Sequence, residues 1–361
     1  MRKKRSLTNF NNSGKRFFRA FALIASRMLA LRSLFSLHFL SMSIDSSLPL
    51  IIVNPKSAGG ATNERWAAVA SDLRTHFGAF QVAFTKKQGD GIELAKRGAD
   101  AGRKFIIACG GDGTINEVAN GILASGTNCE LGVLPSGTGG DFRRTLGMPI
   151  GAREAARNLR NGETKLIDAG RATFFDHAGE QISRYFLNVA SFGLSASIIQ
   201  RVKTTSALDW LPVNALRGKA SFAISTLQEV FDINYTTVRI KIDDGEEKQL
   251  NTINFCVANS RFFGGGMKIA PDAKLNDGFL DVVNIGDIRT AKILLNAYKL
   301  YNGTHLDLPE VKSTLAQKIE ISPADKHQTI NIEIDGELPG TLPATFEVVP
   351  NALRVRVPKK N

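Results

Sequence analysis

The stretch CGGDGTINE, at residues 109–117, decides the fold of this chain. It follows an apolar run at residues 105–108 that predicts a buried strand, and it precedes apolar residues with helical spacing over 118–123. A glycine-rich turn between a parallel strand and a helix presents backbone N–H groups and the positive helix end, so it predicts a phosphate-binding loop. Asp112 fits such a loop if a divalent cation lies between its carboxylate and the phosphate, whereas a Gly-Asp-Gly turn alone can simply reverse the chain.

An alternating α/β pattern surrounds this loop. Three predicted strands end in polar, glycine-bearing turns: NPKSAGG at residues 54–60, the stretch at 109–117, and SGTGGD at 136–141. The alternation predicts a parallel sheet with right-handed crossovers, and the turns predict a ligand at the carboxyl edge of that sheet. We expect strands at residues 49–53, 80–84, 105–108 and 131–135, and helices at about 64–77 and 91–101.

The pattern changes after about residue 170. Short β-rich runs separated by turns such as NDG, at residues 276–278, predict an antiparallel β-sandwich with helical inserts near 215–231 and 291–301. We expect the strands of the sandwich at residues 185–190, 237–242, 253–258, 279–283, 318–321, 330–334, 344–348 and 353–357. The predicted fold class is therefore α/β plus all-β, a three-layer α/β domain followed by an antiparallel β-sandwich.

The length of 361 residues also favours two domains. We divide the chain into an N-terminal extension at residues 1–47, the α/β domain at 48–170 and the sandwich at 171–358, and we leave open whether the C-terminal segment returns to the first domain. The three cysteines are scattered without metal-ligand spacing, and an odd number gives no disulfide framework. This cysteine usage favours a reducing cytoplasm.

The positive charge is concentrated at the N-terminus. Residues 1–47 hold nine basic residues and one acid, so they contribute +8 of the net charge of +12 and leave +4 for the other 314 residues. Such a mildly basic globular part does not predict nucleic-acid binding. It fits a protein that meets anionic lipid head groups or polyanionic nucleotides.

The basic extension has three interpretations, and the sequence leaves them open. Its longest uncharged run, residues 33–44, is 12 residues long and therefore too short to span a bilayer. The segment is an amphipathic helix lying on a membrane, a disordered basic tail, or an upstream extension of a protein that naturally starts at Met42. N-terminal sequencing of the native protein distinguishes the third interpretation from the other two.

Several further motifs occur in a fixed order along the chain. After NPKS at residues 54–57 and GGDGTINE at 110–117 come LPSGT at 134–138, which leads to Asp141, then GGMKIAP at 265–271, LNDG at 275–278 and DGE at 335–337. This ordered set resembles the diacylglycerol kinase catalytic family, which includes bacterial lipid kinases, sphingosine kinases and ceramide kinases. The resemblance covers about residues 50–358 and implies the α/β and sandwich architecture shared by NAD kinases and diacylglycerol kinases.

The resemblance implies transfer of the γ-phosphate of ATP to a lipid hydroxyl, with Mg²⁺, in a cleft between the two domains. By match to the family motifs, the nucleotide contacts fall on Asn54, Ser57, Thr85, Gly111, Asp112, Gly113, Thr114, Asn116, Glu117 and Thr138. Four carboxylates match catalytic positions of the family. Asp335 and Glu337 match the acidic pair assigned to activating the hydroxyl, with Glu337 as the usual proton acceptor, and Asp112 and Asp141 match residues that help to hold Mg²⁺. Phosphoryl transfer to an alcohol needs a cation and a proton acceptor, so carboxylates suit these tasks without any resemblance.

Two further positions bear on the family pattern. The NDG turn resembles a structural metal loop, which would use the Asp277 carboxylate with the carbonyls of Lys274 and Phe279, although Asp277 alone is also a common hairpin residue. The family usually has asparagine where this chain has Gly140. That change marks either a subfamily with a different acceptor lipid or weakened catalysis, and we favour the first because every acidic position is kept.

The sequence therefore predicts an ATP- and Mg²⁺-dependent lipid kinase acting on a diacylglycerol-like or a sphingoid- or ceramide-like lipid. The alternatives are an NAD kinase-like enzyme and a catalytically weakened module that senses nucleotide and lipid. The expected partners are ATP and membrane lipid at the bilayer surface, without nucleic acid, in a cytoplasmic protein peripherally associated with the membrane, and a homodimer is left open. Apolar runs at residues 210–213 and 261–263 are candidates for membrane contact, or for internal packing.

Overall fold

The computed structural model describes residues 46–137, 139–204 and 235–359, and these all belong to one compact unit, Ser46–Asn361. Several predictions lie outside the described residues. They are the interpretations of residues 1–45, the nucleotide contact of Thr138, the apolar run at 210–213 and the helix at 215–231.

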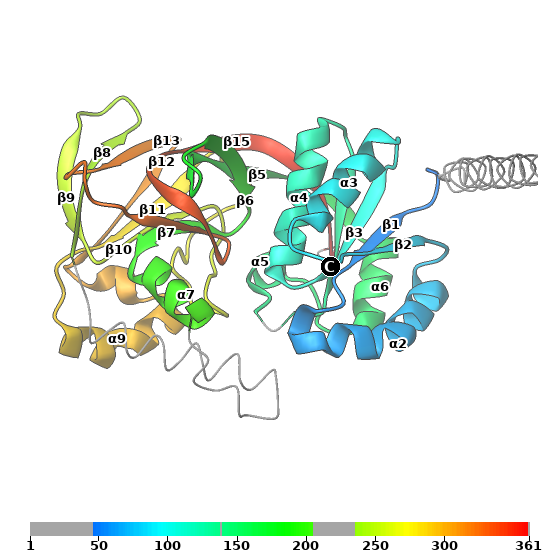
Figure 1. The fold of residues 1–361 in the computed structure, drawn as a ribbon. Coiled ribbons are helices and arrows are strands. Elements are labelled where there is room, and N and C mark those ends of the chain that lie inside the picture. The colour runs from blue at the N-terminus through cyan, green and yellow to red at the C-terminus, as the bar shows by residue number, and fades with distance from the viewer. Residues whose placement is uncertain (1–45, 138, 205–234, 360–361) are drawn as a thin grey trace, which may run out of the picture. The chain divides into compact units, whose positions relative to one another are not determined.

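The first part of the described chain is a parallel sheet with helices on both faces (Figure 1). Its strands lie in the order β4-β3-β1-β2 with every pair parallel. Strands β1, β3 and β4 are buried almost throughout because both faces are covered, which is why they read as continuous apolar runs. The elements are β1 (Leu50–Val53), η1 (Ser57–Gly60), α2 (Ala61–His76), β2 (Gln81–Phe84), α3 (Asp90–Asp100), β3 (Phe105–Gly110), α4 (Asp112–Ser125), β4 (Glu130–Pro135), α5 (Asp141–Thr145) and α6 (Ala152–Asn161).

Two hydrophobic cores flank this sheet. Ile52 and Ile106 pack with α4 on one face, whereas Ile51 and Ile107 pack with α2 and α6 on the other. Adjacent residues of a strand point to opposite faces, so each strand supplies both cores. The predicted three-layer α/β architecture is confirmed.

The second part is a mainly antiparallel set of strands with its own core of phenylalanines. Phe192 stacks on Phe255 at a centroid distance of 5.2 Å, and Phe186 meets Phe346 edge-on at 6.4 Å. The predicted sandwich is confirmed as a fold class. Its elements are β5 (Glu163–Asp176), β6 (Gln181–Phe186), β7 (Val189–Gly193), α7 (Leu194–Thr204), β8 (Thr236–Ile242), β9 (Lys248–Thr252), β10 (Asn254–Ala258), β11 (Leu280–Ile285), α9 (Thr290–Asn302), η2 (His305–Asp307), β12 (Val311–Ala316), β13 (Lys318–Pro323), β14 (Asn331–Ile334) and β15 (Glu337–Val357).

Three expectations about strands were wrong. The run at residues 185–190 is two strands, because the chain between β6 and β7 turns its backbone N–H groups toward Asp335. The runs at 344–348 and 353–357 are one strand, β15, whose register shifts between Val349 and Leu353. Strands β5, β9 and β12 were not expected, because none of them alternates strictly between buried and exposed positions: β9 buries only Thr252, and β12 buries only its first and last residues.

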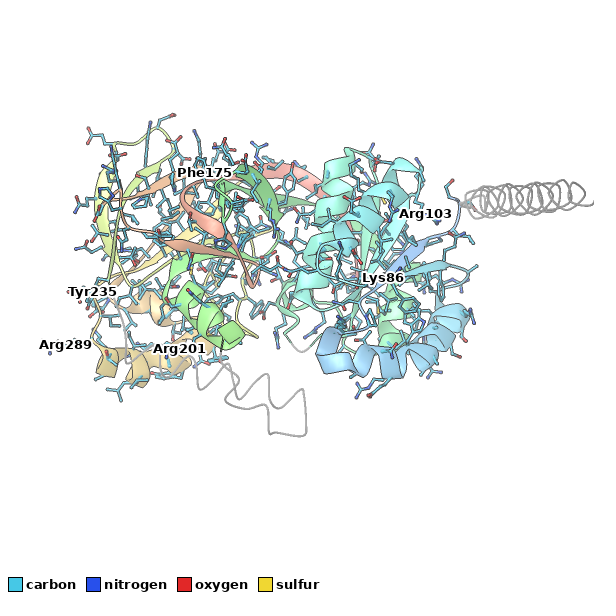
Figure 2. The ribbon with its side chains drawn as sticks, viewed as in Figure 1. Lys86, Arg103, Phe175, Arg201, Tyr235 and Arg289 are labelled. Carbon is cyan, nitrogen blue, oxygen red and sulfur yellow. The ribbon has the colours of Figure 1, made fainter. Side chains whose placement is uncertain are left out.

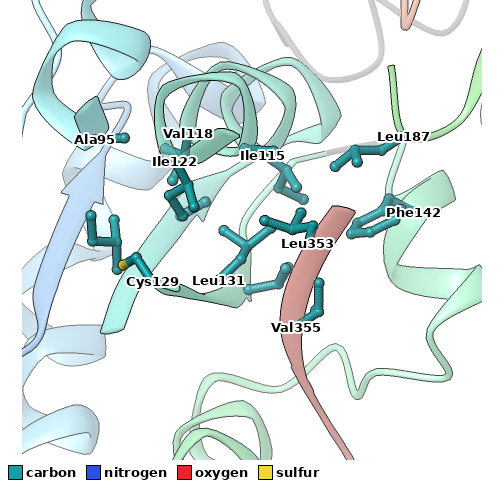
Figure 3. Close-up of a cluster of buried hydrophobic side chains, with 14 of the residues drawn as sticks. Ala95, Ile115, Val118, Ile122, Cys129, Leu131, Phe142, Leu187, Leu353 and Val355 are labelled. Carbon is teal, nitrogen blue, oxygen red and sulfur yellow. The ribbon is translucent and has the colours of Figure 1, made fainter. Parts of the chain in front are cut away.

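Strand β15 links the two parts. It pairs with β5 from Gly340 to its end at Val357 and with β13 over residues 344–347, and near its end Arg354 and Val355 also pair in parallel with Glu130 and Leu131 of β4. Figure 3 shows Leu353 and Val355 packed beside Leu131 in the core of the α/β part. The C-terminal segment therefore forms the strand next to β4 in the α/β sheet.

Candidate active site

A cavity of about 230 Å³ lies where β1, β2 and β3 end. Eight of its lining residues come from the turns after these strands and the start of α4, one comes from within α4, and the last, Glu337, begins β15 of the sandwich. The lining residues are Asn54, Lys56, Thr85, Lys86, Lys87, Gln88, Gly113, Thr114, Glu117 and Glu337. Six residues that the sequence analysis placed in the site, far apart in the chain, thus share one cavity.

The turn after β1 is fixed by its polar side chains. The Asn54 amide donates to the Thr114 hydroxyl at 3.1 Å, and its Oδ1 accepts from the Lys56 N–H at 3.0 Å. The Ser57 hydroxyl lies behind the cavity, where it hydrogen-bonds with Thr62 and, at 3.2 Å, with Ser136. These bonds hold the turns after β1, β3 and β4 against one another, so Ser57 joins loops and does not line the cavity.

Glu117 holds the loop that follows β2. Its two carboxylate oxygens accept the N–H groups of Gly89 and Gly91 at 2.8 and 2.9 Å. Burial raises the pKa of Glu117, and the nearby charge of Glu337 raises it further. A Cβ on Gly91 would meet the Glu117 carboxylate at 2.6 Å, so this close approach requires glycine.

The loop held by Glu117 carries the main residues that the sequence analysis missed. Lys86, labelled in Figure 2, Lys87 and Gln88 line the cavity, as does Lys56 from the turn after β1. Three lysines around one polar cavity provide charge for a polyphosphate. The sequence does contain a signal for Lys86 and Lys87, because they follow Thr85 directly in a basic turn at the end of a predicted parallel strand.

Asp112 and Asp141 lie side by side just outside the cavity lining. The Asp112 carboxylate accepts the N–H groups of Gly140, Asp141 and Phe142 at 2.8, 3.2 and 3.1 Å, so it caps the start of α5. The Asp141 carboxylate pairs with Arg144 at 2.8 Å and accepts the Gly265 N–H at 2.8 Å. Burial raises the pKa of Asp141, and the Asp112 charge adds to this effect.

This pair fits a divalent cation in charge. Two adjacent carboxylates repel one another, and Mg²⁺ is commonly held by one or two carboxylates together with phosphate oxygens and water. In keeping with this, the part of the chain that the structure describes has no ready-made cluster of three or more His, Cys, Asp or Glu ligands. The role of Asp112 and Asp141 in holding Mg²⁺ stays a prediction.

The backbone at Gly140 explains the departure from the family asparagine. Gly140 has φ = +68° and ψ = +38°, in the left-handed region. Glycine adopts this conformation without strain, and asparagine is among the few other residues that tolerate it. Asparagine can therefore occupy this position at a small conformational cost, and this chain differs from the family pattern here by the loss of an amide side chain.

Asp335 is enclosed by hydrogen-bond donors. Its carboxylate accepts the N–H groups of Leu187, Asn188 and Val189 at 2.8, 2.9 and 3.0 Å, and the Asn116 amide at 2.7 Å. Burial raises its pKa to about 6, although these four bonds act in the opposite direction. Asp335 and Asn116 thus hold the turn before β15 against α4, and neither lines the cavity.

Glu337 and Glu117 both line the cavity, but whereas Glu117 accepts backbone N–H groups, Glu337 accepts hydrogen bonds from side chains. Gln88 donates to Oε1 at 2.6 Å and Arg184 of β6 donates to Oε2 at 3.0 Å. About a quarter of its side chain is exposed, 27%. Arg184 and Gln88 were not predicted, because nothing in the sequence relates them to a glutamate more than 150 residues away.

The predicted metal loop lies at a second cavity of about 560 Å³. Asp277 and Lys274 line it together with Asp272 and Asp281, which the sequence analysis did not single out. Burial and the charges of Asp277 and Asp272 raise the pKa of Asp281 to about 6. The Phe279 N–H donates to the Asp277 carboxylate at 3.2 Å. Among the described residues these carboxylates do not form a group of three that could hold a metal ion, and the metal role of Lys274, Asp277 and Phe279 stays a prediction.

Comparisons with known proteins agree with this architecture. The model of the diacylglycerol kinase catalytic domain matches residues 49–172, and the model of the YegS C-terminal NAD kinase beta sandwich-like domain matches residues 188–357. A crystal structure of a diacylglycerol kinase from Bacillus anthracis has the same fold, with a TM-score of 0.62 at 23% identity over 86% of this chain and 97% of that one.

Curated relatives cover most of the chain as well. A diacylglycerol kinase of Bacillus subtilis is 29% identical over 86% of this chain and 96% of its own length. One of Staphylococcus epidermidis is 30% identical over 76% of this chain and 81% of its own length, and one of Mycobacterium tuberculosis is 28% identical over 85% and 94%. The chain therefore belongs to the diacylglycerol kinase catalytic domain family of lipid kinases.

Proposed function

We propose that this protein uses Mg-ATP to phosphorylate the hydroxyl group of a diacylglycerol-like lipid. One observation carries the proposal: a single cavity is lined by Gly113 and Thr114 of the phosphate-binding loop and by Glu337, a carboxylate able to accept a hydroxyl proton. The names of the relatives favour diacylglycerol over a sphingoid- or ceramide-like acceptor. We place the reaction at the cytoplasmic surface of a membrane.

The nucleotide phosphates lie against the start of α4. The N–H groups of Gly113 and Thr114 belong to the first turn of this helix, where they have no partner within the helix and meet the positive end of its dipole. Lys56, Lys86 and Lys87 add positive charge on the facing loops. Together these groups orient the terminal phosphate toward the side of the cavity that contains Glu337.

Asp112 and Asp141 are the residues that would hold Mg²⁺. When bound, the ion neutralises charge on the phosphate oxygens, which lowers the barrier to attack by an alcohol. The chain's own contribution is to keep the two carboxylates adjacent: α5 is fixed to Asp112, and Asp141 is fixed to Gly265 of the sandwich.

Glu337 accepts the proton of the lipid hydroxyl as that oxygen attacks the terminal phosphorus, whose bond to the bridging oxygen breaks so that ADP leaves. Gln88 and Arg184 hydrogen-bond to the two oxygens of Glu337, so the orientation of the carboxylate is fixed before the lipid binds. Asp335 fixes the turn that carries Glu337, because four donors anchor its carboxylate to β7 and α4. In this proposal Glu337 is the base and Asp335 is a positioning residue.

The test is a kinase assay of the purified protein with Mg-ATP and a lipid panel, read by mass spectrometry of newly phosphorylated lipids. We expect phosphorylated diacylglycerol, and we expect Glu337→Gln to lower kcat by about 10²–10⁴-fold while ATP binding is kept. Glu320→Gln is the matched control, since Glu320 is an exposed acid of the sandwich paired with Lys318. Phosphate transferred to NAD, or to no lipid of the panel, would reject the proposal.

A further inference from the structure

Helix α9 exposes an unusual number of large apolar and aromatic side chains. Leu294, Leu295, Tyr298 and Tyr301 are 40, 76, 58 and 55% exposed, and they are four of the eleven exposed large hydrophobic residues in the described chain. Their spacing of one, four and seven residues from Leu294 places them along one side of the helix. The helix contains no buried residue, so this side is not part of the sandwich core.

The charge of α9 is positive. Residues 289–302 contain Arg289, Lys292 and Lys299 and no aspartate or glutamate. Lys292 pairs with Glu310 on the protein side, whereas Arg289 is exposed at the start of the helix. Figure 2 shows Arg289 and the half-exposed Tyr235 at the end of the molecule that carries α9, and the Tyr235 hydroxyl donates to Asp287 at 2.6 Å. An apolar and aromatic stripe flanked by cations suits an anionic lipid surface.

The opposite side of α9 is connected to the candidate active site. Leu300 packs into a small core with Phe263, and its carbonyl accepts the Lys268 N–H at 2.7 Å. The same loop, residues 261–268, contains Gly265, whose N–H donates to Asp141. A single short loop therefore joins the exposed helix to Asp141, one of the acids of the candidate active site.

We infer that α9 is a membrane-docking helix, which lies in the surface of a bilayer containing anionic lipids and so presents the site to a lipid substrate. The inference rests on the proposed lipid kinase function, because that function gives the protein a reason to dock on a membrane. The exposure and charge of α9 are the evidence that this helix is the docking surface. Tyrosine suits this position because its ring enters the apolar boundary while its hydroxyl stays hydrated. Its thirteen residues give the helix a length of about 20 Å, along which it can contact the membrane surface.

The direct test is binding of the full chain to vesicles of phosphatidylcholine, with and without phosphatidylglycerol. The double variant Leu295→Ser/Tyr298→Ser should lower the vesicle partition coefficient about tenfold or more, because two apolar side chains no longer enter the interface. Arg289→Gln should lower binding about five-fold on anionic vesicles only, and high salt should remove that difference. Ile150→Ser is the matched control, because Ile150 is 74% exposed on the α/β part and should not affect binding.

A second measurement separates this inference from the proposed function. The double variant should lose activity toward diacylglycerol embedded in vesicles and keep its activity toward a short-chain diacylglycerol dispersed in water. If the unaltered protein phosphorylates neither form, the proposed function fails, while vesicle binding still tests the helix. Unchanged circular dichroism and thermal midpoint ensure that the double variant is folded.

Three outcomes would overturn the inference. The first is unchanged vesicle binding by the folded double variant. The second is a shift from dimer to monomer caused by the same substitutions without vesicles, with vesicle binding unchanged, which would mean that a second copy covers α9. The third is that the same substitutions make residues 205–234 newly susceptible to proteolysis while vesicle binding is unchanged. That result would mean that this segment covers the helix.

Discussion

The acidic side chains around the cavity differ in the kind of hydrogen-bond donor that their carboxylate oxygens accept. Asp112, Glu117 and Asp335 accept two or more backbone N–H groups each, and so they fix loops. Glu337 accepts only side-chain donors and faces the cavity. A carboxylate is the strongest acceptor available for several N–H groups at once, so a site built from loops uses acids for its scaffold as well as its chemistry.

Replacement of Asp335 by asparagine tests its anchoring role. Each oxygen of Asp335 accepts two donors, and the amide nitrogen of asparagine would face two of them without an acceptor. We expect Asp335→Asn to lower the free energy of unfolding by about 2–4 kcal/mol in urea titrations. An equal loss for Asp307→Asn, an acid of η2 distant from the turn in sequence, would contradict the specific role.

The pH dependence of the same variant has a defined sign. The folded-state pKa of Asp335 is raised to about 6 from 3.8, so between these values the folded protein binds more protons than the unfolded chain. Stability from this group is therefore present below about pH 4 and is lost as the pH rises toward 6. The stability of the unaltered protein relative to Asp335→Asn should be about 1–3 kcal/mol greater at pH 4.5 than at pH 7.5, measured by urea unfolding at both values.

The left-handed conformation of Gly140 gives a prediction about substitution. Gly140→Asn should cost less than about 1 kcal/mol and keep lipid kinase activity, because asparagine tolerates φ = +68°. Gly140→Val should cost about 1–2 kcal/mol or more, because a β-branched residue is strained at this φ. Calorimetric midpoints of the two variants compare these costs, and equal midpoints would show that the backbone conformation does not matter here.

At the scale of elements, β15 is shared by two cores. Phe346, in its middle, belongs to the phenylalanine core of the sandwich, and Leu353 and Val355 belong to the core above the parallel sheet. The Arg356 guanidinium donates one hydrogen bond to each carboxylate oxygen of Glu130, both at 2.7 Å. It also lies over the Phe105 ring, 4.9 Å from the ring centroid. The last residues of the sandwich strand therefore stabilise a sheet whose other strands end more than 200 residues earlier.

A truncation of one side chain tests this dependence. Leu353 is buried in the core of the α/β part, so Leu353→Ala should lower the free energy of unfolding by about 2–4 kcal/mol and weaken ATP binding with it. Leu315→Ala is the matched control, since Leu315 is 50% exposed on β12. If calorimetry gave the two variants the same midpoint, the packing of β15 against β4 would not matter for stability.

At the scale of the whole described unit, several hydrogen bonds cross between the two parts around the site, and three of them end on acidic side chains. Asn116 donates to Asp335 at 2.7 Å, Gln88 to Glu337 at 2.6 Å and Gly265 to Asp141 at 2.8 Å. In each of these three bonds, one residue belongs to the α/β part and the other belongs to the sandwich part. These bonds bring Glu337, the other acids and the glycine-rich loop before α4 close together.

Nucleotide binding should therefore stabilise the whole unit. We expect Mg-ATP to raise the thermal midpoint by an amount that increases with ligand concentration, and we expect EDTA to remove most of the increase. Lys86→Gln/Lys87→Gln should lose at least half of the increase, because the two lysines line the cavity. Lys248→Gln, on exposed β9, should behave like the unaltered protein in the same differential scanning fluorimetry. Equal shifts in all three proteins would place the nucleotide elsewhere.

The two-part architecture and the position of the glycine-rich loop at residues 109–117 follow from local patterns in the sequence. Apolar runs, helical spacing and glycine turns are local signals, and a parallel sheet brings the ends of its strands to one edge. The sequence pattern alone therefore places Asn54, Thr85 and Gly113 together, as the cavity confirms. The ordered motifs added Glu337 to the same site.

Three features depend on tertiary packing: which hydrogen bonds each acid accepts, the continuity of β15 through both parts, and the set of lysines that line the cavity. Asn116 and Asp335 are 219 residues apart, Arg184 and Glu337 are 153 apart, and Gln88 and Glu337 are 249 apart. Hydrogen bonds across such separations depend on the packing of complete elements, which no periodicity along the chain records. The same reason hid the break between β6 and β7, because its cause is a carboxylate supplied from a turn almost 150 residues later.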